Sequence, residues 1–268
     1  MRRRSVAVSV VMLALLGCGT QDPPLDSVDA LAMGQRVMDV PTERPSMIVE
    51  RAPGPLTIDG QVDAAWKKAD PVEFVFPWND VAAEGAQSTK ARVLWDDANL
   101  YLLYECVDPY LDSEVLDHDG PVYNEDAVEI FATPNPDNVT AYFGYEMNIH
   151  GTFLDYMAFK GGTDRTKSIH FEWEAEGIQI ATTHDGTLND HSDTDRGWIL
   201  EMAIPFENFR HLGGTLPPKE GDVWRWNLNR TKGYDGQFSI WSDTGTDQAN
   251  FHISDRFGYA TFTTNVAD

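Results

Sequence analysis

Apolar and polar residues alternate in many short runs from about residue 48 to the C-terminus. An alternation with a period of two is typical of β-strands, because successive side chains point to opposite faces of a sheet. The predicted strands cover residues 56–60, 72–76, 90–95, 99–107, 126–133, 141–149, 152–159, 177–184, 197–205, 222–231, 237–243 and 256–263. Turn residues separate these runs at short intervals without alternating helices, which indicates stacked sheets.

The pattern therefore predicts an all-β fold: an antiparallel β-sandwich, with immunoglobulin-like or jelly-roll-like layers and one or two short helices. Residues 99–107 are apolar on both faces and should form a central strand that is buried on both sides. The helices are expected at residues 63–69 and 205–212. Residues 159–177 and 182–197 are polar and rich in turn residues, so we expect long loops there, at the ends of the sandwich where binding groups commonly lie.

The stretch 120–134, "GPVYNEDAVEIFATP", carries charge in an unusual place. If it is a strand, one of its faces carries Tyr123, Glu125, Glu129 and Phe131. A carboxylate that shares a face with aromatic rings is costly unless something pairs with it. Glu129 is therefore expected either to face a ligand or to form an ion pair with Arg225 or Arg230.

The N-terminus has the layout of an export signal, with Arg2, Arg3 and Arg4 before a short apolar run that ends in Leu15-Leu16-Gly17-Cys18. This ending resembles a bacterial lipobox, in which the signal is cut before the cysteine and the cysteine carries the lipid. The alternative is an ordinary secretory signal that happens to contain a cysteine. We expect a lipoprotein signal peptide over residues 1–17, lipidation at Cys18, a disordered tether over 18–47 and one sandwich domain over 48–268.

These features predict an exported protein of the bacterial cell envelope that contacts the membrane only through its lipid anchor. Gly19 follows the cysteine where an Asp would favour the inner membrane, so the outer membrane is expected. The other cysteine, Cys106, lies in an apolar run. It is expected to be a buried, small apolar residue rather than a nucleophile.

The formal net charge is −23 at neutral pH, and three of the positive charges lie in the signal segment. Nucleic acid is not an expected partner, because binding it needs a basic surface. Anionic polysaccharides would also be repelled. A neutral ligand or a divalent cation suits this charge better, although solubility outside the cell explains the charge equally well.

Seven segments of the chain together resemble the family 9 carbohydrate-binding module, from about residue 48 to 263. In order they read "LTIDGQVDAAW", "ARVLWDDANLYLLYECVDP", "NEDAVEIFATP", "YFGYEMNIHGTFLD", "GWILEMAIPFENF", "GDVWRWNLNRTKG" and "IWSD…NFHISDRFGYATF". The resemblance implies a β-sandwich that holds the end of a sugar chain between two aromatic rings. It also implies that carboxylates and amides bind the sugar hydroxyls.

The resemblance places the two rings at Tyr123 and Phe251, the carboxylate at Glu129 and the side-chain amides at Asn229 and Gln248. Rings suit this role because the C–H face of a pyranose matches an aromatic π-face. Charged acceptors suit it because they make the stronger hydrogen bonds. The implied function is non-catalytic binding of a neutral poly- or oligosaccharide by a lipoprotein, in polysaccharide capture or catabolism.

The chain departs from the family pattern at three positions. Sugar-binding members carry Trp at both ring positions, where this chain has Tyr and Phe. An Arg that binds hydroxyls in the family aligns with Gly144. Glu146 follows on the same strand face and is expected to take over that role. Other aromatic residues that could serve a platform are Trp78, Trp173 and Trp241.

Other functions stay open from the sequence. A glycoside hydrolase would need a carboxylate pair, and the candidates are Glu125, Asp126, Glu129 and Glu146. The DOMON-like superfamily that includes this family also holds haem-binding electron-transfer domains, for which Met147 with His150, or Met157, would be axial ligands. Without a C-x-x-C-H motif any haem would be non-covalent. No cofactor is assigned; calcium is compatible with the turn residues Asp59, Asp63, Asp96, Asp97 and Asp108, but the pattern assigns no ligand set.

Overall fold

The computed structural model describes residues 43–78, 87–159, 169–232 and 237–267. The predicted signal peptide, Cys18 and most of the predicted tether lie outside these residues. No helix in the described part of the chain is both long and apolar enough to span a membrane. The first strand begins at Ser46, just before the predicted start of the domain.

The strands are β1 Ser46–Arg51, β2 Val72–Glu73, β3 Thr89–Trp95, β4 Asn99–Val107, β5 Ala127–Thr133, β6 Ala141–Asn148, β7 Phe153–Phe159, β8 Ile169–His170, β9 Gln179–Asp185, β10 Gly197–Pro205, β11 Val223–Thr231, β12 Ser239–Ile240 and β13 Gly258–Val266. Short 3₁₀ helices are η1 Trp66–Lys68, η2 Val122–Asn124, η4 Phe206–Leu212 and η5 Ser254–Arg256. Two of them, η1 and η4, lie where the sequence predicted short helices.

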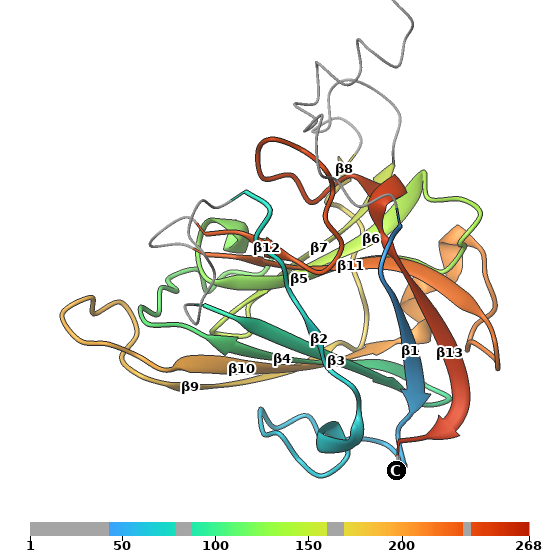
Figure 1. Ribbon diagram of the computed structural model, residues 1–268, viewed down its shortest axis with the longest axis horizontal. Coiled ribbons are helices and arrows are strands. Elements are labelled where there is room, and N and C mark those ends of the chain that lie inside the picture. The colour runs from blue at the N-terminus through green and yellow to red at the C-terminus, as the bar shows by residue number, and fades with distance from the viewer. Residues whose placement is uncertain (1–42, 79–86, 160–168, 233–236, 268) are drawn as a thin grey trace, which may run out of the picture. The chain divides into compact units, whose positions relative to one another are not determined.

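The strands form one continuous sheet in the order β8-β7-β6-β5-β11-β13-β1-β3-β4-β10-β9, with β12 beside β11 and β2 beside β3. The sheet curls into two layers. In Figure 1, β5, β6, β7 and β11 form the upper layer, β3, β4, β9 and β10 form the lower layer, and β1 and β13 run between them at the right. Pairing is antiparallel except at β1, which is parallel to both β13 and β3.

The main core lies between the two layers. Val128 and Ile130 of β5 and Leu102 and Tyr104 of β4 belong to one buried apolar cluster, and each of them is fully buried. β4 pairs with β3 on one side and β10 on the other, so it is the central buried strand that the sequence predicted. The all-β sandwich prediction is confirmed.

Residues 56–60 are not the strand that the sequence predicted. The N–H groups of Asp59 and Gly60 donate to the Glu201 carboxylate of β10, at 2.8 and 2.6 Å, instead of joining a ladder. The Trp66 indole donates to the other oxygen of the same carboxylate at 2.5 Å. Glu201 therefore anchors a non-strand segment over the outer face of β3 and β4, where Trp66 packs in a second apolar cluster with Leu103.

Cys106 is buried on β4, as predicted, and forms no disulfide. Burial raises the pKa of its thiol to about 12. The thiolate is the nucleophilic form, so this position does not support a nucleophilic role.

Candidate functional site

Three polar side chains lie in a row on the outer face of the upper layer. Glu129 of β5 is paired across the ladder with Glu146 of β6 on one side and Asn229 of β11 on the other. Facing residues of paired strands point the same way. The flanking residues of β5, Val128 and Ile130, point to the main core, so Glu129 points away from it. The three residues, called here the acid–amide row, are 2%, 5% and 0% exposed, in the order named.

The acid–amide row has acceptors that its neighbours do not use. The Asn229 side-chain amide donates to Glu129 Oε2 at 3.1 Å, and the Tyr156 hydroxyl donates to Glu146 Oε1 at 2.9 Å. Glu146 Oε2 and Asn229 Oδ1 are buried and accept no hydrogen bond from the described residues. A buried polar atom without a partner costs about 1–3 kcal/mol. The row is therefore incomplete as a structural network and is chemically suited to a ligand that brings hydroxyl donors.

The two carboxylates of the row hold protons more tightly than ordinary glutamates. Burial is the largest cause for both: it raises the pKa of Glu146 to about 7 and the pKa of Glu129 well above its ordinary value. The charge of Glu146 raises the pKa of Glu129 further, and the hydrogen bond from Asn229 opposes the rise. Near neutral pH the pair therefore carries less than its full double charge.

Aromatic rings border the acid–amide row on the same face. Phe131, two residues along β5, stacks on the His252 ring with centroids 4.9 Å apart and planes 19° apart. Its ring centroid lies 6.0 Å from that of Tyr156 and 5.6 Å from that of Tyr142. Phe131, Tyr142 and Tyr156 belong to a third apolar cluster on the outer face of β5, β6 and β7.

Gly144 of β6 makes room for Tyr156. A Cβ atom at Gly144 would overlap the Tyr156 ring and its hydroxyl. The family resemblance aligned an arginine of the family with Gly144. In the structure the Tyr156 ring lies over Gly144, and its hydroxyl donates a hydrogen bond to Glu146. Glu146 thus lies in the row as expected, with a partner that the sequence analysis missed. The sequence feature that could have revealed this partner is Gly144, which is paired with the aromatic Tyr156 on the next strand.

The two predicted ring residues lie in different environments. Tyr123 is 47% exposed and lies in η2, because the strand begins only at Ala127; the prediction that Tyr123 and Glu125 share a continuous strand with Glu129 is wrong. Phe251 is 8% exposed and packs on Trp78, with ring centroids 5.5 Å apart. Whether these rings hold a sugar stays a prediction.

Gln248 lies in an exposed stretch, whereas the residues of the acid–amide row are buried. Its backbone carbonyl accepts a hydrogen bond from the Thr246 hydroxyl at 2.8 Å. The structure thus brings together Glu129, Glu146 and Asn229 of the predicted site residues, and leaves a role for the Gln248 amide as a prediction.

The predicted alternative of an ion pair between Glu129 and an arginine is wrong. The Arg230 guanidinium bonds to the Asp108 carboxylate at 2.7 Å. The Arg225 guanidinium donates to the carbonyls of Phe257 and Asp255, at 2.9 Å from its Nε to Phe257 and at 3.0 Å from Nη2 to Asp255. Neither arginine compensates Glu129, whose partner is an amide.

Glu125 and Asp126 have structural partners, unlike the acid–amide row. The Glu125 carboxylate accepts from the Glu114 and Val115 N–H groups at 2.7 and 3.1 Å, and from the Asn148 amide at 2.6 Å. Asp126 pairs with the buried Lys232 ammonium at 3.2 Å. Glu125 therefore holds the segment before β5, and Asp126 compensates the charge of Lys232. Of the four candidate acids, Glu129 and Glu146 are the pair with an acceptor atom that no described residue uses.

The residues considered for haem have packing and turn roles. Met147 is fully buried in the main core, and Met157 packs against that core. The His150 ring bonds to the Ser113 carbonyl at 3.0 Å.

The turn aspartates considered for calcium hold local structure. Asp63 and Asp96 accept from N–H groups of their own turns. Asp97 pairs with Arg51 at 2.8 Å, Asp108 pairs with Arg230 and Lys232, and Asp59 accepts from the Gln61 N–H at 3.0 Å. Within the described residues, the cluster of acids and a histidine that lie close enough to share one metal ion contains none of these five aspartates.

The curled two-layered sheet, with a buried row of acids and amide bordered by aromatic rings on one outer face, is that of a β-sandwich domain with a candidate binding site. The chain belongs to the family described as carbohydrate family 9 binding domain-like, whose model matches residues 58–265.

Curated relatives are larger enzymes that match over this region. The chain is 27% identical over 178 residues to exoglucanase XynX of Acetivibrio thermocellus, which covers 66% of this chain and 14% of that protein. It is 30% identical over 159 residues to endo-1,4-beta-xylanase C of Paenibacillus barcinonensis, which covers 59% of this chain and 12% of that protein. The chain thus matches only a small part of these relatives' length.

Solved structures share the fold. A candidate carbohydrate-binding protein from Bacteroides uniformis superposes with a TM-score of 0.64 at 18% identity, over 82% of this chain and all of that chain. A family 9 carbohydrate-binding module from Caldicellulosiruptor kristjanssonii in complex with cellotriose gives 0.54 at 19% identity, over 82% of this chain and 94% of that chain. At these identities the likeness supports the fold alone.

Proposed function

We propose that this protein binds a neutral oligo- or polysaccharide, without catalysis, at the outer face of β5, β6, β7 and β11. The observation that carries the proposal is the acid–amide row, in which Glu146 Oε2 and Asn229 Oδ1 are buried acceptors without a described donor. Sugar hydroxyls are donors that match them, and a carboxylate accepts more strongly than a neutral oxygen. Membership of the family supports carbohydrate as the ligand class.

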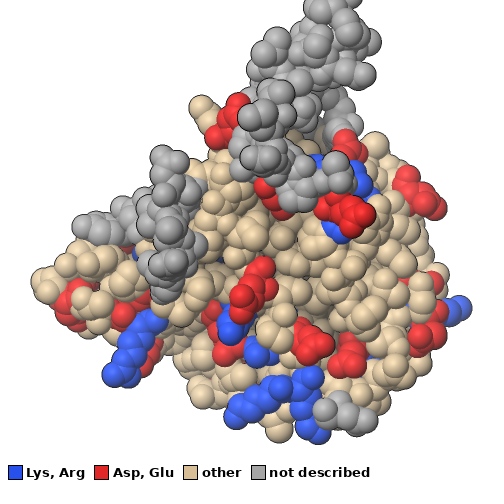
Figure 2. Space-filling model, viewed as in Figure 1, with Lys and Arg blue, Asp and Glu red and all other residues tan. Residues whose placement is uncertain are grey.

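The surrounding rings support the same ligand class. Phe131 and Tyr156 border the row as buried rings, Phe251 belongs to the same apolar cluster, and the partly buried Trp78 packs against that cluster. A pyranose presents C–H groups on its faces and hydroxyls around its edge, so it matches apolar rings beside acceptors. The charge is also compatible, because a neutral ligand is not repelled by the acidic chain. Figure 2 shows acidic and basic side chains scattered over broad uncharged areas of one face, rather than a continuous basic patch of the kind that nucleic acid requires.

The proposed setting is polysaccharide capture or catabolism outside the cell. Cys18 would anchor the domain in the outer membrane through lipid. The relatives named as xylanases and an exoglucanase support plant-type glucans and xylans as the first ligands to test. In this proposal the domain holds the polysaccharide, and bond cleavage belongs to other proteins or domains.

A glycan array followed by calorimetric titration tests the proposal. We expect binding to at least one neutral glycan, with cello- and xylo-oligosaccharides as the first candidates. No binding to any neutral glycan would contradict it. A Soret band in the absorption spectrum of the purified protein would instead indicate haem, and release of reducing sugar from a bound glycan would indicate catalysis.

A further inference from the structure

A cluster of one histidine and three acids lies apart from the acid–amide row. Its members are His118 and Asp119 in the segment before η2, Asp155 on β7, and Glu174 after β8. Each offers one potential ligand atom, and these four atoms all lie within 4.8 Å of one another. The cluster therefore brings together three segments that are far apart in the sequence. It is called here the His118 cluster.

The orientation of His118 is fixed by two contacts with Phe153. The His118 Nδ1 atom lies 2.9 Å from the Phe153 carbonyl, and the two rings lie with centroids 4.5 Å apart. A carbonyl accepts only, so Nδ1 carries a hydrogen, and in the neutral ring the lone pair is on Nε2 and is left for another partner. This is the arrangement in which a backbone carbonyl orients a metal-binding histidine.

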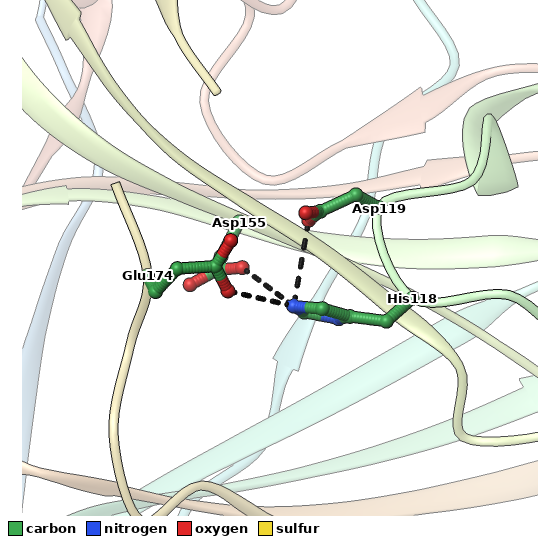
Figure 3. A group of neighbouring side chains, drawn as sticks. All are labelled: His118, Asp119, Asp155 and Glu174. Atoms are coloured by element: carbon green, nitrogen blue, oxygen red, sulfur yellow. Dashed lines mark hydrogen bonds and ion pairs between the residues drawn. The ribbon is translucent and has the colours of Figure 1, made fainter. Parts of the chain in front are cut away.

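The Nε2 atom of His118 faces three carboxylates at once. It lies 2.9 Å from Glu174 Oε2, 3.6 Å from Asp119 Oδ1 and 3.6 Å from Asp155 Oδ1. Figure 3 shows the three carboxylates converging on this ring nitrogen. One imidazolium could neutralise only one of the three acids, so the ion pairs alone leave the cluster with excess negative charge.

Asp155 gives independent evidence of a missing partner. Its side chain is fully buried, and its Oδ2 atom accepts from the Ala175 N–H at 2.5 Å. Its Oδ1 atom is buried without a hydrogen bond from the described residues and is aimed at His118 Nε2. A buried carboxylate oxygen is costly without a compensating charge or donor. The exposed neighbours leave an open side through which an ion can enter, since His118 and Glu174 are 44% and 55% exposed.

We propose that His118, Asp119, Asp155 and Glu174 bind one divalent transition-metal ion, with zinc as the best match. Calcium and magnesium prefer oxygen ligands alone, whereas zinc takes imidazole nitrogen together with carboxylate oxygens. Ligands at about 2.0–2.2 Å in a tetrahedral zinc shell lie roughly 3.3–3.5 Å apart. The 2.9–3.6 Å separations from Nε2 are close to that range.

The ion would have a structural role that is separate from sugar binding. It would tie the segment around Glu174 to β7 and to the segment before η2. Because the ion binds the folded arrangement, it stabilises the domain by an amount that rises with the logarithm of its concentration relative to its dissociation constant. The proposal does not depend on the proposed carbohydrate function.

Calorimetric titration of the untagged, EDTA-treated and dialysed full chain with zinc chloride tests the site. We expect one equivalent of zinc to bind and the melting temperature to rise. His118→Ala removes the nitrogen ligand from a partly exposed position and should weaken zinc binding at least tenfold. Asp155→Asn should also weaken zinc binding.

His191→Ala is the matched control. His191 pairs with Asp112 at 2.7 Å but belongs to no metal-site group in the part of the chain that the structure describes. This control should bind zinc as the wild type does. The proposal is overturned if the wild type binds no zinc, if His118→Ala binds it equally well, or if calcium binds at this site more tightly than zinc.

Discussion

Glu129 and Glu146 are paired across β5 and β6. The Asn229 amide donates a hydrogen bond to Glu129, and the Tyr156 hydroxyl donates one to Glu146. Two adjacent buried carboxylates are an electrostatic cost to the folded protein. The proposed binding of hydroxyl groups would account for two acids at positions 129 and 146, where a pair of apolar residues would give a more stable sheet. The same cost makes the role of the pair measurable.

Glu146→Gln should make the protein more stable at alkaline pH. The folded-state pKa of Glu146 is raised to about 7 and that of Glu129 is also raised, so between about pH 4.5 and 7 the folded state binds more protons than the unfolded state. Wild-type stability should therefore fall as pH rises through this window. Removing one charge also relieves the repulsion on Glu129, so the expected gain at pH 8 is on the order of 1–3 kcal/mol.

Melting temperatures from pH 4 to pH 8.5 check this prediction. The variant and the wild type should melt alike at the acid end, where both carboxylates are protonated, and diverge as pH rises. Other buried acids titrate equally in both proteins and cancel in the difference. Parallel curves at all pH values would show that the pair is not an electrostatic cost.

Gly144→Ala should destabilise the domain by about 1–3 kcal/mol, as is typical when a well-packed site is overfilled. The added methyl would overlap the Tyr156 ring and push its hydroxyl away from Glu146. Gly54→Ala is the matched control, because a Cβ atom there meets nothing within 4 Å. Equal unfolding free energies for the two variants, from denaturant titration, would contradict the packing described for Gly144.

At the scale of elements, the local pattern predicted the long strands because alternation within one strand reflects which face is buried. It failed where a distant residue decides the backbone. Residues 56–60 alternate like a strand, yet Glu201 of β10 takes the N–H groups of Asp59 and Gly60. β1 was not predicted, since its two parallel partners lie far away in the sequence.

The acid–amide row was partly predictable, because alternation along a strand fixes which side chains share a face. Glu129, Glu146 and Asn229 lie on strands whose alternation fixes their face, and the family resemblance selected them. Tyr123 was misplaced because the strand was extended backwards through Pro121. Proline has no N–H to donate to a ladder, and η2 occupies that stretch instead. The contact between Tyr156 and Glu146 depends on register between strands, which one sequence does not specify.

Glu201→Ala should cost about 3 kcal/mol or more of folding free energy. The change leaves the Trp66 indole and two backbone N–H groups without their charged acceptor, and each such loss is large in a buried position. The control is Glu105→Ala on neighbouring β4, which removes a partly exposed ion pair with Arg92 and should cost less than about 1 kcal/mol. Urea titrations of both variants measure the difference, and equal costs would contradict the anchoring role of Glu201.

At the scale of the whole molecule, the proposed lipid at Cys18 would tether the domain to the membrane. Cys18→Ser should remove lipid attachment and move the protein from the membrane fraction to the soluble fraction, with no change in the melting temperature of the domain. Fractionation and intact mass measure both properties. A variant that stays in the membrane fraction to the wild-type extent would contradict the lipoprotein proposal.

We propose that the acid–amide row serves ligand binding rather than the stability of the fold. A double variant, Glu129→Gln with Glu146→Gln, removes whatever negative charge the pair carries while preserving shape, and Glu105→Gln serves as the control on the other layer. With a neutral glycan that the wild type binds, calorimetric titration at pH 8 is the most direct measurement. We expect at least a tenfold loss of affinity, the difference between charged and neutral acceptors, in a protein that melts higher than the wild type. Unchanged affinity in the more stable double variant would contradict it.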